Sequence, residues 1–258
     1  MEEITIKQLV EAGVHFGHRK DKWNPKMQNF IFTERRGIHV IDLKKTIEYM
    51  EKAYEAVASN TKEGKTIIFV GTKKQAKDII KEEAERAGVF YVSERWLGGT
   101  LTNFSTIRMA VNRMKELEEK FEKQEFGDLT KKEILTLKRE LEKLKKNLYG
   151  IRDMENLPDM AYICDIRKEK NALKEANKLG IPIVGIVDTN VDPTFVEYPI
   201  PANDDAIRSI SIITKTIANA VLEGKKVREE EKEGEKVKEE RKEEKRRKKE
   251  KSKSKEKE

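Results

Sequence analysis

The sequence contains one cysteine, six prolines and no long hydrophobic run. With only Cys164, the chain can form neither an intrachain disulfide nor a zinc site built from several thiolates, which is typical of proteins from a reducing compartment. Its longest apolar stretch, around residues 181–187, is far shorter than the roughly 20 residues that a membrane-spanning helix needs. The acidic start at residues 1–3 is unlike a signal peptide. We therefore expect a soluble cytoplasmic protein with no membrane partner, in which Cys164 fills part of the core.

Charge is abundant but unevenly distributed. Charged residues make up 40% of the chain and the formal net charge is +7, but residues 225–258 hold 17 Lys and Arg against 12 Glu and so carry five of those seven charges. Residues 1–224 are nearly neutral, so any basic surface on them must be local. We expect residues 225–258 to be a disordered charged tail or a loose solvated helix, because they have few apolar residues to bury. This tail either keeps the protein soluble or contacts a polyanion through residues 246–249.

The rest of the chain alternates between strand and helix patterns. Short β-branched or aromatic runs predict strands at residues 38–41, 66–70, 89–92, 160–166 and 183–187. Apolar residues at helical spacing predict helices at residues 43–58, 73–87, 169–179 and 205–222. This alternation is typical of βαβ units. We therefore expect an α/β domain, made of residues 1–102 and 149–224, with a parallel five-stranded sheet between helices.

Residues that begin or end helices support these boundaries. Thr72 and Gln75 have the spacing of a capping box, and residues 203–205 suit a helix N-terminus. Gly88 and Gly180 are typical of helix C-termini. The sequence thus predicts a helix that begins directly after Thr72.

No strand is predicted between residues 103 and 148. Apolar residues step by three or four along residues 107–121 and again along residues 134–148. A turn and a capping box formed by Thr130 and Glu133 separate the two patterns. We expect an antiparallel coiled-coil hairpin of two helices, each roughly 30 Å long, inserted in the α/β domain and projecting from it.

Motifs of the common nucleotide-binding and hydrolytic enzymes are missing from the sequence. The P-loop, the Gly-x-Gly-x-x-Gly fingerprint, His-Glu-x-x-His and Gly-x-Ser-x-Gly do not occur. The nearest feature is the glycine turn at residues 69–75, which leads from a strand into a helix N-terminus with Lys73 and Lys74. Because a helix N-terminus binds anions readily, these lysines either contact RNA phosphates, line a nucleotide pocket or lie in solvent beside a simple cap.

Carboxylates gather where the predicted strands end. They are Asp165, Asp188, Asp192, Asp204 and Asp205. The carboxyl edge of a parallel sheet is the usual ligand site of such folds, so the cluster could hold magnesium or supply an acid and a base. The same residues are also common in turns and at helix N-termini. The alternative function is therefore a cytosolic α/β nucleotide-binding enzyme that uses the strand-end loops, with Thr72, Lys73 and Asp188.

The segment from residue 13 to residue 37 is both basic and aromatic. Its basic side chains are His15, His18, Arg19, Lys20, Lys22, Lys26, Arg35 and Arg36. Its aromatic side chains are Phe16, Trp23, Phe30 and Phe32. Cations neutralise phosphates and aromatic rings stack on unpaired bases, so this pattern favours RNA binding. Two alternatives are that the aromatic rings pack the segment onto the domain, and that His15 and His18 bind a metal without nearby third and fourth ligands.

A second unusual stretch runs from Arg95 to Phe104 and contains the adjacent glycines Gly98 and Gly99. The glycines permit close approach of the backbone to a ligand, and Arg95 with Trp96 could hold a phosphate and a base. The alternative is a tight elbow that sets the direction of the helical hairpin.

Six motifs follow one another along the chain. They are Gly13-Val14-His15-Phe16-Gly17-His18 with Trp23-Asn24-Pro25-Lys26-Met27, residues 95–104, Leu157-Pro158-Asp159, residues 179–184, Val187-Asp188-Thr189-Asn190 with Asp192-Pro193, and residues 201–208. Together with the helical hairpin, they resemble the S-two family of small ribosomal subunit proteins. The resemblance extends from about residue 5 to residue 223, and the hairpin favours the bacterial form of the family.

The resemblance implies a fold and a function. Members of the family have a flavodoxin-like α/β domain with a projecting coiled-coil hairpin and are not enzymes. They hold small-subunit ribosomal RNA between head and body and are associated with docking of the large OB-repeat ribosomal protein numbered one. We expect a ribosomal protein in the cytoplasm that acts in translation, with neighbouring ribosomal proteins as partners and with no cofactor, metal, catalytic residue or small-molecule substrate. A third possibility is an adaptor whose hairpin binds a protein partner. The predicted RNA-binding residues are His15, His18, Arg19, Lys22, Trp23, Lys26, Arg35, Arg36, Lys73, Lys74, Arg95, Trp96, Asn103 and Arg108.

Overall fold

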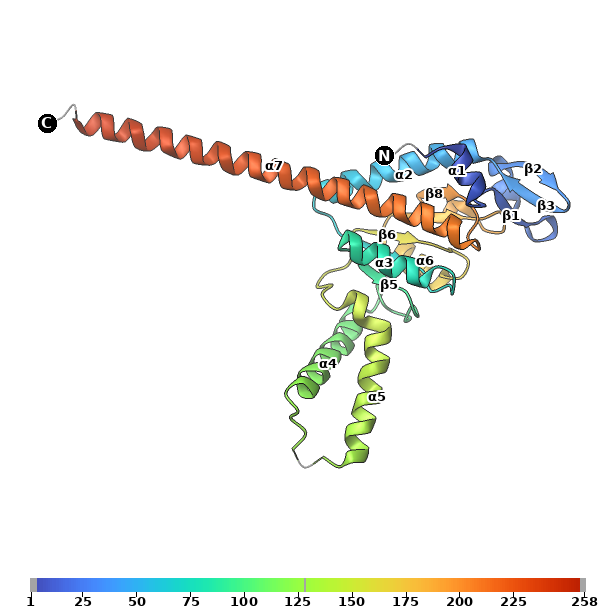
Figure 1. Cartoon of the computed structure of the whole chain (residues 1–258), viewed down its shortest axis with the longest axis horizontal. Helices are drawn as coiled ribbons and strands as arrows, with labels where there is room; N and C mark the ends of the chain where they lie inside the picture. The colour runs from blue at the N-terminus through green and yellow to red at the C-terminus, as the bar shows by residue number, and fades with distance from the viewer. Residues whose placement is uncertain (1–3, 128, 256–258) are drawn as a thin grey trace.

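The computed structural model describes residues 4–127 and 129–255, with side chains up to residue 233 (Figure 1). Its centre is a five-stranded sheet in which every neighbouring pair of strands is parallel. The strand order is β5 (Phe90–Val92), β4 (Ile67–Val70), β6 (Met160–Ile163), β7 (Ile183–Val187) and β8 (Tyr198–Pro201). The predicted α/β fold with a parallel five-stranded sheet is confirmed.

Two details of the predicted sheet are wrong. The strand at residues 38–41 belongs to a second, antiparallel sheet, and the fifth parallel strand is β8, which was not predicted. Pro199 and Pro201 weaken the strand pattern of β8, because proline has no N–H to donate to a neighbouring strand. The sheet tolerates both prolines because β8 is an edge strand, with β7 as its only neighbour in the sheet.

Helices cover both faces of the parallel sheet. One face carries α1 (Ile6–Glu11), α2 (Leu43–Lys62), α3 (Lys77–Ala87) and the first part of α7 (Ile207–Lys255). The other carries α6 (Lys170–Leu179) and the base of α4 (Phe104–Glu122). Side chains alternate between the two cores along each strand, so that Phe69 of β4 joins the first core while Ile68 and Val70 join the second. The resulting three-layer arrangement is the flavodoxin-like one expected.

The second sheet lies at the N-terminal end of the chain. It consists of β1 (Phe16–Arg19), β3 (Ile38–Ile41) and β2 (Ile31–Arg35), in that order, and the short 3-10 helices Lys20–Lys22 and Pro25–Phe30 connect β1 to β2. Arg36 and Gly37 both have positive φ, 54° and 76°, which gives the tight turn that joins β2 to β3. We call residues 13–41 the N-terminal module.

Two helices project from the domain (Figure 1). They are α4 and α5 (Lys131–Leu148), joined across a turn and linked by an ion pair of 3.0 Å between Arg113 Nε and Glu140 Oε1. The predicted capping box is confirmed, because Thr130 and Glu133 exchange hydrogen bonds at the start of α5. Buried Met114, Leu117 and Leu141 extend the second core into the base of the pair. The coiled-coil geometry of these helices stays a prediction.

The start of α3 differs from the prediction. The helix begins at Lys77, and residues 73–76 form turns before it. The Thr72 hydroxyl and backbone N–H both donate to Glu169 Oε1, at 2.6 and 2.7 Å, so Thr72 caps no helix. The predicted helix ends are confirmed, because Gly88 and Gly180 adopt the left-handed conformation after α3 and α6.

Helix α7 is the longest element and leaves the domain as a straight extension (Figure 1). Its first part packs along α2, and residues 225–255 continue the same helix. Of the two forms expected for the charged tail, the structure has the helix. The division of the chain into units at residues 103, 148 and 225 stays a prediction.

A glycine sets the closeness of the α2–α7 contact. A Cβ atom added at Gly224 would lie 2.4 Å from the backbone oxygen of Ala58 and 2.8 Å from Thr61 Cβ. We expect Gly224→Ala to lower the free energy of unfolding by about 1–3 kcal/mol, because the backbone of α2 must move aside. Urea denaturation measures the change, with Gly98→Ala as the control, since a Cβ there meets nothing within 4 Å. Equal stability of the two variants would contradict this account of the contact.

Candidate nucleic-acid interface and carboxylate cluster

The N-terminal module is attached to the carboxyl edge of the parallel sheet. The loop after β7 provides Thr189, whose hydroxyl accepts a hydrogen bond from His18 N–H (2.8 Å) and whose carbonyl accepts one from Asn24 N–H (2.8 Å). The loop after β8 provides Asn203, whose side-chain amide donates to the carbonyl of Phe16 (2.7 Å). The module therefore depends on two loops that lie far away in the sequence.

A buried cluster of carboxylates lies beneath this attachment. Lys73 Nζ lies 3.0 Å from Asp165 Oδ2, 2.9 Å from Asp204 Oδ1 and 2.7 Å from Asp205 Oδ1. His18 Nδ1 lies 3.1 Å from Asp188 Oδ1, and its Nε2 lies 3.5 Å from Asp205 Oδ2. Four of the predicted strand-end carboxylates thus come together around one lysine and one histidine.

The cluster shifts the pKa values of its members. Burial, together with the negative charges of Asp165 and Asp188, raises the pKa of Asp204 to about 7. Burial alone would lower the pKa of Lys73, but the surrounding carboxylates raise it. The hydrogen bond to Asp188 raises the pKa of His18. Lys73 is therefore the counter-ion of the carboxylates, and His18 is held by its hydrogen bond to Asp188.

The same cluster contains atoms of the kind that bind cations. One nitrogen of His18 and carboxylate oxygens of Asp188 and Asp204 lie within 4.8 Å of one another. His15 does not join them: its Nδ1 is buried without a hydrogen-bond partner, and its ring lies 4.1 Å from that of Phe16. The ammonium group of Lys73 lies 2.9 Å from Asp204 Oδ1 and would repel a cation bound there. The contacts present join the N-terminal module to the loops after β7 and β8.

The residues named for the alternative enzyme are also used internally. Thr72 donates to Glu169, Lys73 is held by three carboxylates, and Asp188 accepts from the backbone N–H of Thr189 and contacts His18. The Cys164 thiol is fully buried, and burial raises its pKa. This arrangement holds the loops in place.

The predicted RNA-binding residues divide by exposure. The exposed ones are Arg19, Lys22, Lys26, Arg35, Arg36, Lys74, Arg95 and Asn103. Half-buried ones are His15, His18, Trp23, Lys73 and Arg108. Two of the exposed cations already have carboxylate partners, Arg19 with Asp21 (3.1 Å) and Lys26 with Asp192 (2.6 Å). Arg108 donates to the carbonyl of Arg152.

Trp96 has a different role from the one its sequence suggested. Its side chain is buried, and its indole N–H donates to Glu175 Oε1 (3.0 Å). Glu175 also accepts the backbone N–H groups of Gly99 (2.9 Å), Leu101 (3.0 Å) and Thr102 (3.2 Å). Partial burial would raise the pKa of Glu175, but these donors lower it. Trp96 thus has no free face for a base, and the stretch at residues 95–104 is an elbow organised by Glu175.

Glu175 was not identified from the sequence. It lies within a predicted helix among other charged residues, and nothing in its neighbourhood indicates that five donors from a distant loop, the Thr102 hydroxyl included, converge on it. Only the arrangement of α6 beside that loop reveals its role.

The exposed side chains of the N-terminal module form its outer surface. Phe32 is 73% exposed on β2, and Arg35 and Arg36 follow it at the end of the hairpin. Among the side chains that the structure describes, neither arginine has a carboxylate within 4.0 Å. Phe16 of β1 is also half exposed, at 51%. This surface combines free cations with aromatic rings.

The chain matches known proteins over most of its length. The family model described as ribosomal protein S2 matches residues 9–224. The chain belongs to the ribosomal protein S2 family. Over 231 residues it is 58% identical to the small ribosomal subunit protein uS2 of Dictyoglomus thermophilum, covering 90% of this chain and 94% of that protein. It is 56% identical to the uS2 protein of Fusobacterium nucleatum, covering 88% and 92% of the two chains.

Membership confirms the resemblance carried by the six motifs. The S2 family is one of structural ribosomal proteins, so this chain is a component of the small subunit that acts in translation, in the cytoplasm, and ribosomal RNA and other ribosomal proteins are its partners. In the described part of the chain, no helix has the length and apolar character required to span a bilayer.

Proposed function

We propose that this S2-family protein binds small-subunit ribosomal RNA between head and body through its N-terminal module, and that it supports docking of the large OB-repeat ribosomal protein numbered one. The observation that carries the RNA proposal is the outer surface of the module. There Arg35, Arg36 and Lys22 are exposed, and Phe32 is exposed on β2, the strand that ends at Arg35. Cations neutralise phosphates, while an exposed ring stacks on an unpaired base.

The surroundings of the other predicted RNA-binding residues decide whether their side chains can reach RNA. Lys74 and Arg95 are exposed and belong to the proposed interface. Lys73 and His18 support it from below, since both side chains are held by the carboxylate cluster. The proposed interface is therefore local, as expected for a protein whose first 224 residues are nearly neutral.

We expect Arg35→Ala combined with Arg36→Ala to weaken binding to small-subunit ribosomal RNA by roughly ten-fold or more at physiological salt, because two phosphate contacts are lost. The slope of log K against log salt is expected to fall by about two. Filter binding over a salt series measures both quantities. The matched control is Lys131→Ala with Lys138→Ala, which removes the same charge from exposed positions on α5. If the arginine pair had no more effect than this control, the proposed interface would be in the wrong place.

A further inference from the structure

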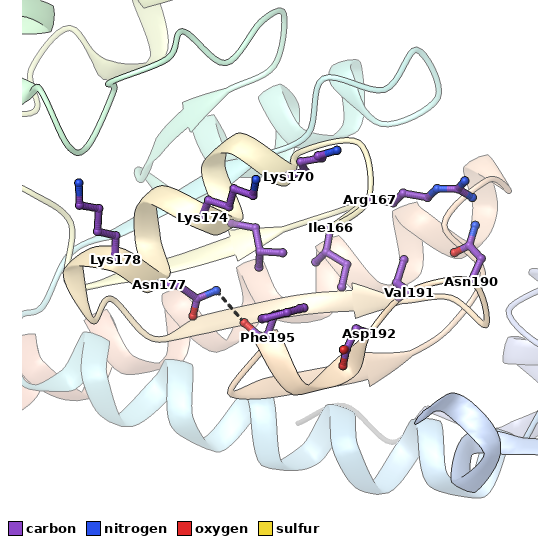
Figure 2. A pocket seen from close by; sticks show the side chains of 11 residues that line it. Ile166, Arg167, Lys170, Lys174, Asn177, Lys178, Asn190, Val191, Asp192 and Phe195 are labelled. Atoms are coloured by element: carbon purple, nitrogen blue, oxygen red, sulfur yellow. Dashed lines mark hydrogen bonds between the residues drawn. The ribbon is translucent and has the colours of Figure 1, made fainter. Parts of the chain in front are cut away.

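A groove with an apolar floor lies between α6 and the loop that joins β7 to β8 (Figure 2). Its volume is about 560 Å³. Ile166 and Val191 form the floor, and the ring of Phe195, 55% exposed, lies at its side. Leu173, which is also buried, lines the same groove. An apolar depression of this size on a protein surface is characteristic of a place where a partner binds.

Cations line the groove along α6. Lys170, Lys174 and Lys178 follow one another at intervals of four residues, so they share one face of the helix and are spaced about 6 Å apart along it (Figure 2). Arg167 adds a fourth cation at the start of the helix. Within residues 4–127 and 129–233, none of the four has a carboxylate within 4.0 Å. These charges are therefore free to meet a partner.

The acidic residue of the groove is already neutralised. Asp192 lies 2.6 Å from Lys26 Nζ and accepts from the backbone N–H of Thr194. The side-chain amide of Asn177 donates to the carbonyl of Phe195 (3.0 Å) and fixes the wall. The groove thus presents a positive rim around an apolar floor, and it faces the solvent as a formed surface.

We propose that this groove binds an acidic amphipathic helix of a partner protein. Apolar side chains of that helix would lie on Ile166, Leu173 and Val191, beside Phe195. Carboxylates one helical turn apart would meet Lys170, Lys174 and Lys178, because two helices lying side by side share the same repeat of about 6 Å. The proposal goes beyond the proposed RNA binding, since it assigns a protein-binding site to a surface outside the N-terminal module.

An RNA strand fits the groove less well. Phosphates would use the cations of the rim and a base could stack on Phe195, but the floor of Ile166 and Val191 is aliphatic and offers that base no hydrogen-bond partner. The same aliphatic floor can bury leucine, isoleucine or phenylalanine side chains of a protein partner.

Fluorescence anisotropy with the purified full-length chain tests the proposal. The probe is a labelled helical peptide of about 15–20 residues with glutamates at four-residue spacing and leucines on the adjoining face. We expect binding with a Kd on the order of 10 μM at physiological salt. The triple charge reversal K170E/K174E/K178E should weaken binding at least ten-fold. The matched control K131E/K138E/K143E, with the same charge change on α5, should leave it unchanged.

Two further measurements separate the contribution of the apolar floor to binding from that of the lysines on the rim. A peptide with serines in place of the leucines should bind at least ten-fold more weakly, and Phe195→Ala should weaken the leucine peptide but not a single-stranded RNA of similar length. The proposal is overturned if the leucine peptide does not bind, if both peptides bind equally well, or if the triple reversal weakens the RNA more than the peptide. Arg35 and Arg36 lie outside the groove. The test of RNA binding at these arginines and the test of peptide binding at the groove can therefore succeed or fail independently of each other.

Discussion

Replacing Lys73 with methionine is expected to lower the free energy of unfolding by about 3–5 kcal/mol at pH values well above 7. Methionine fills a similar volume but leaves Asp165 and Asp204, both buried, without their cation. Loss of one partner from a buried charged group is among the most costly single changes, because the remaining charge is neither solvated nor paired. Urea denaturation of the purified variant measures the loss.

The pH dependence identifies the cause of this loss. Asp204 has a pKa of about 7 with Lys73 in place, and removal of the cation raises that pKa further. In the variant a proton neutralises Asp204 up to a higher pH than in the native chain, so the stability difference between the two should be smallest below about pH 7 and widen as the pH rises above 7. Lys74→Met is the control, because Lys74 is exposed and its loss should change stability by less than about 0.5 kcal/mol. A difference that does not depend on pH would point to packing instead of charge.

Glu175→Ala is the second large change, with an expected loss of about 2–3 kcal/mol. The carboxylate accepts from the indole of buried Trp96 and from three backbone N–H groups, and alanine leaves those donors without an acceptor. Freed from Glu175, Trp96 should become more accessible, which a shift of tryptophan fluorescence to longer wavelength would show.

The sign of the pH effect follows from the lowered pKa of Glu175. A carboxylate whose folded pKa lies below its unfolded value stabilises the protein above the unfolded pKa and loses this contribution as the pH falls through the folded one. The difference between Glu175→Ala and the native chain should therefore be complete at neutral pH and shrink below about pH 4. Glu175→Gln keeps one acceptor oxygen, so the free energy of unfolding of this variant should lie between those of the native chain and Glu175→Ala. If alanine and glutamine at this position were equally stable, the hydrogen bonds would not be the cause.

The sequence predicts the layers of this fold better than its edges. Buried strands such as β4 and β7 are recognisable because runs without polar residues and rich in Ile and Val are typical of strands covered on both faces. The sequence does not predict β8, because two of its four residues are prolines. The run at residues 38–41 is correctly a strand, but alternation along a strand does not show to which sheet it belongs.

The candidate site shows the same limit more sharply. Lys73 follows a glycine turn and would face an anion if a helix began there, but Asp165, Asp204 and Asp205 come from distant loops and surround it. Trp96 beside Arg95 is the kind of residue pair that can bind a base. In the structure the Trp96 side chain is buried instead, with its indole N–H hydrogen-bonded to Glu175. Arg35 and Arg36, by contrast, are exposed at the turn that joins β2 to β3. This position follows from the local sequence around Arg36 and Gly37, without any residue from a distant loop.

The attachment of the N-terminal module has a consequence for the newly made protein. Residues 13–41 are synthesised before Thr189 and Asn203, which hold them. A growing chain therefore carries the basic segment for about 150 residues of synthesis without the loops that give the segment its shape. Products of premature termination before residue 188 would lack those loops altogether. The folded surface is thus restricted to chains that extend past Asn203, and shorter chains would compete for the same RNA only as flexible basic peptides.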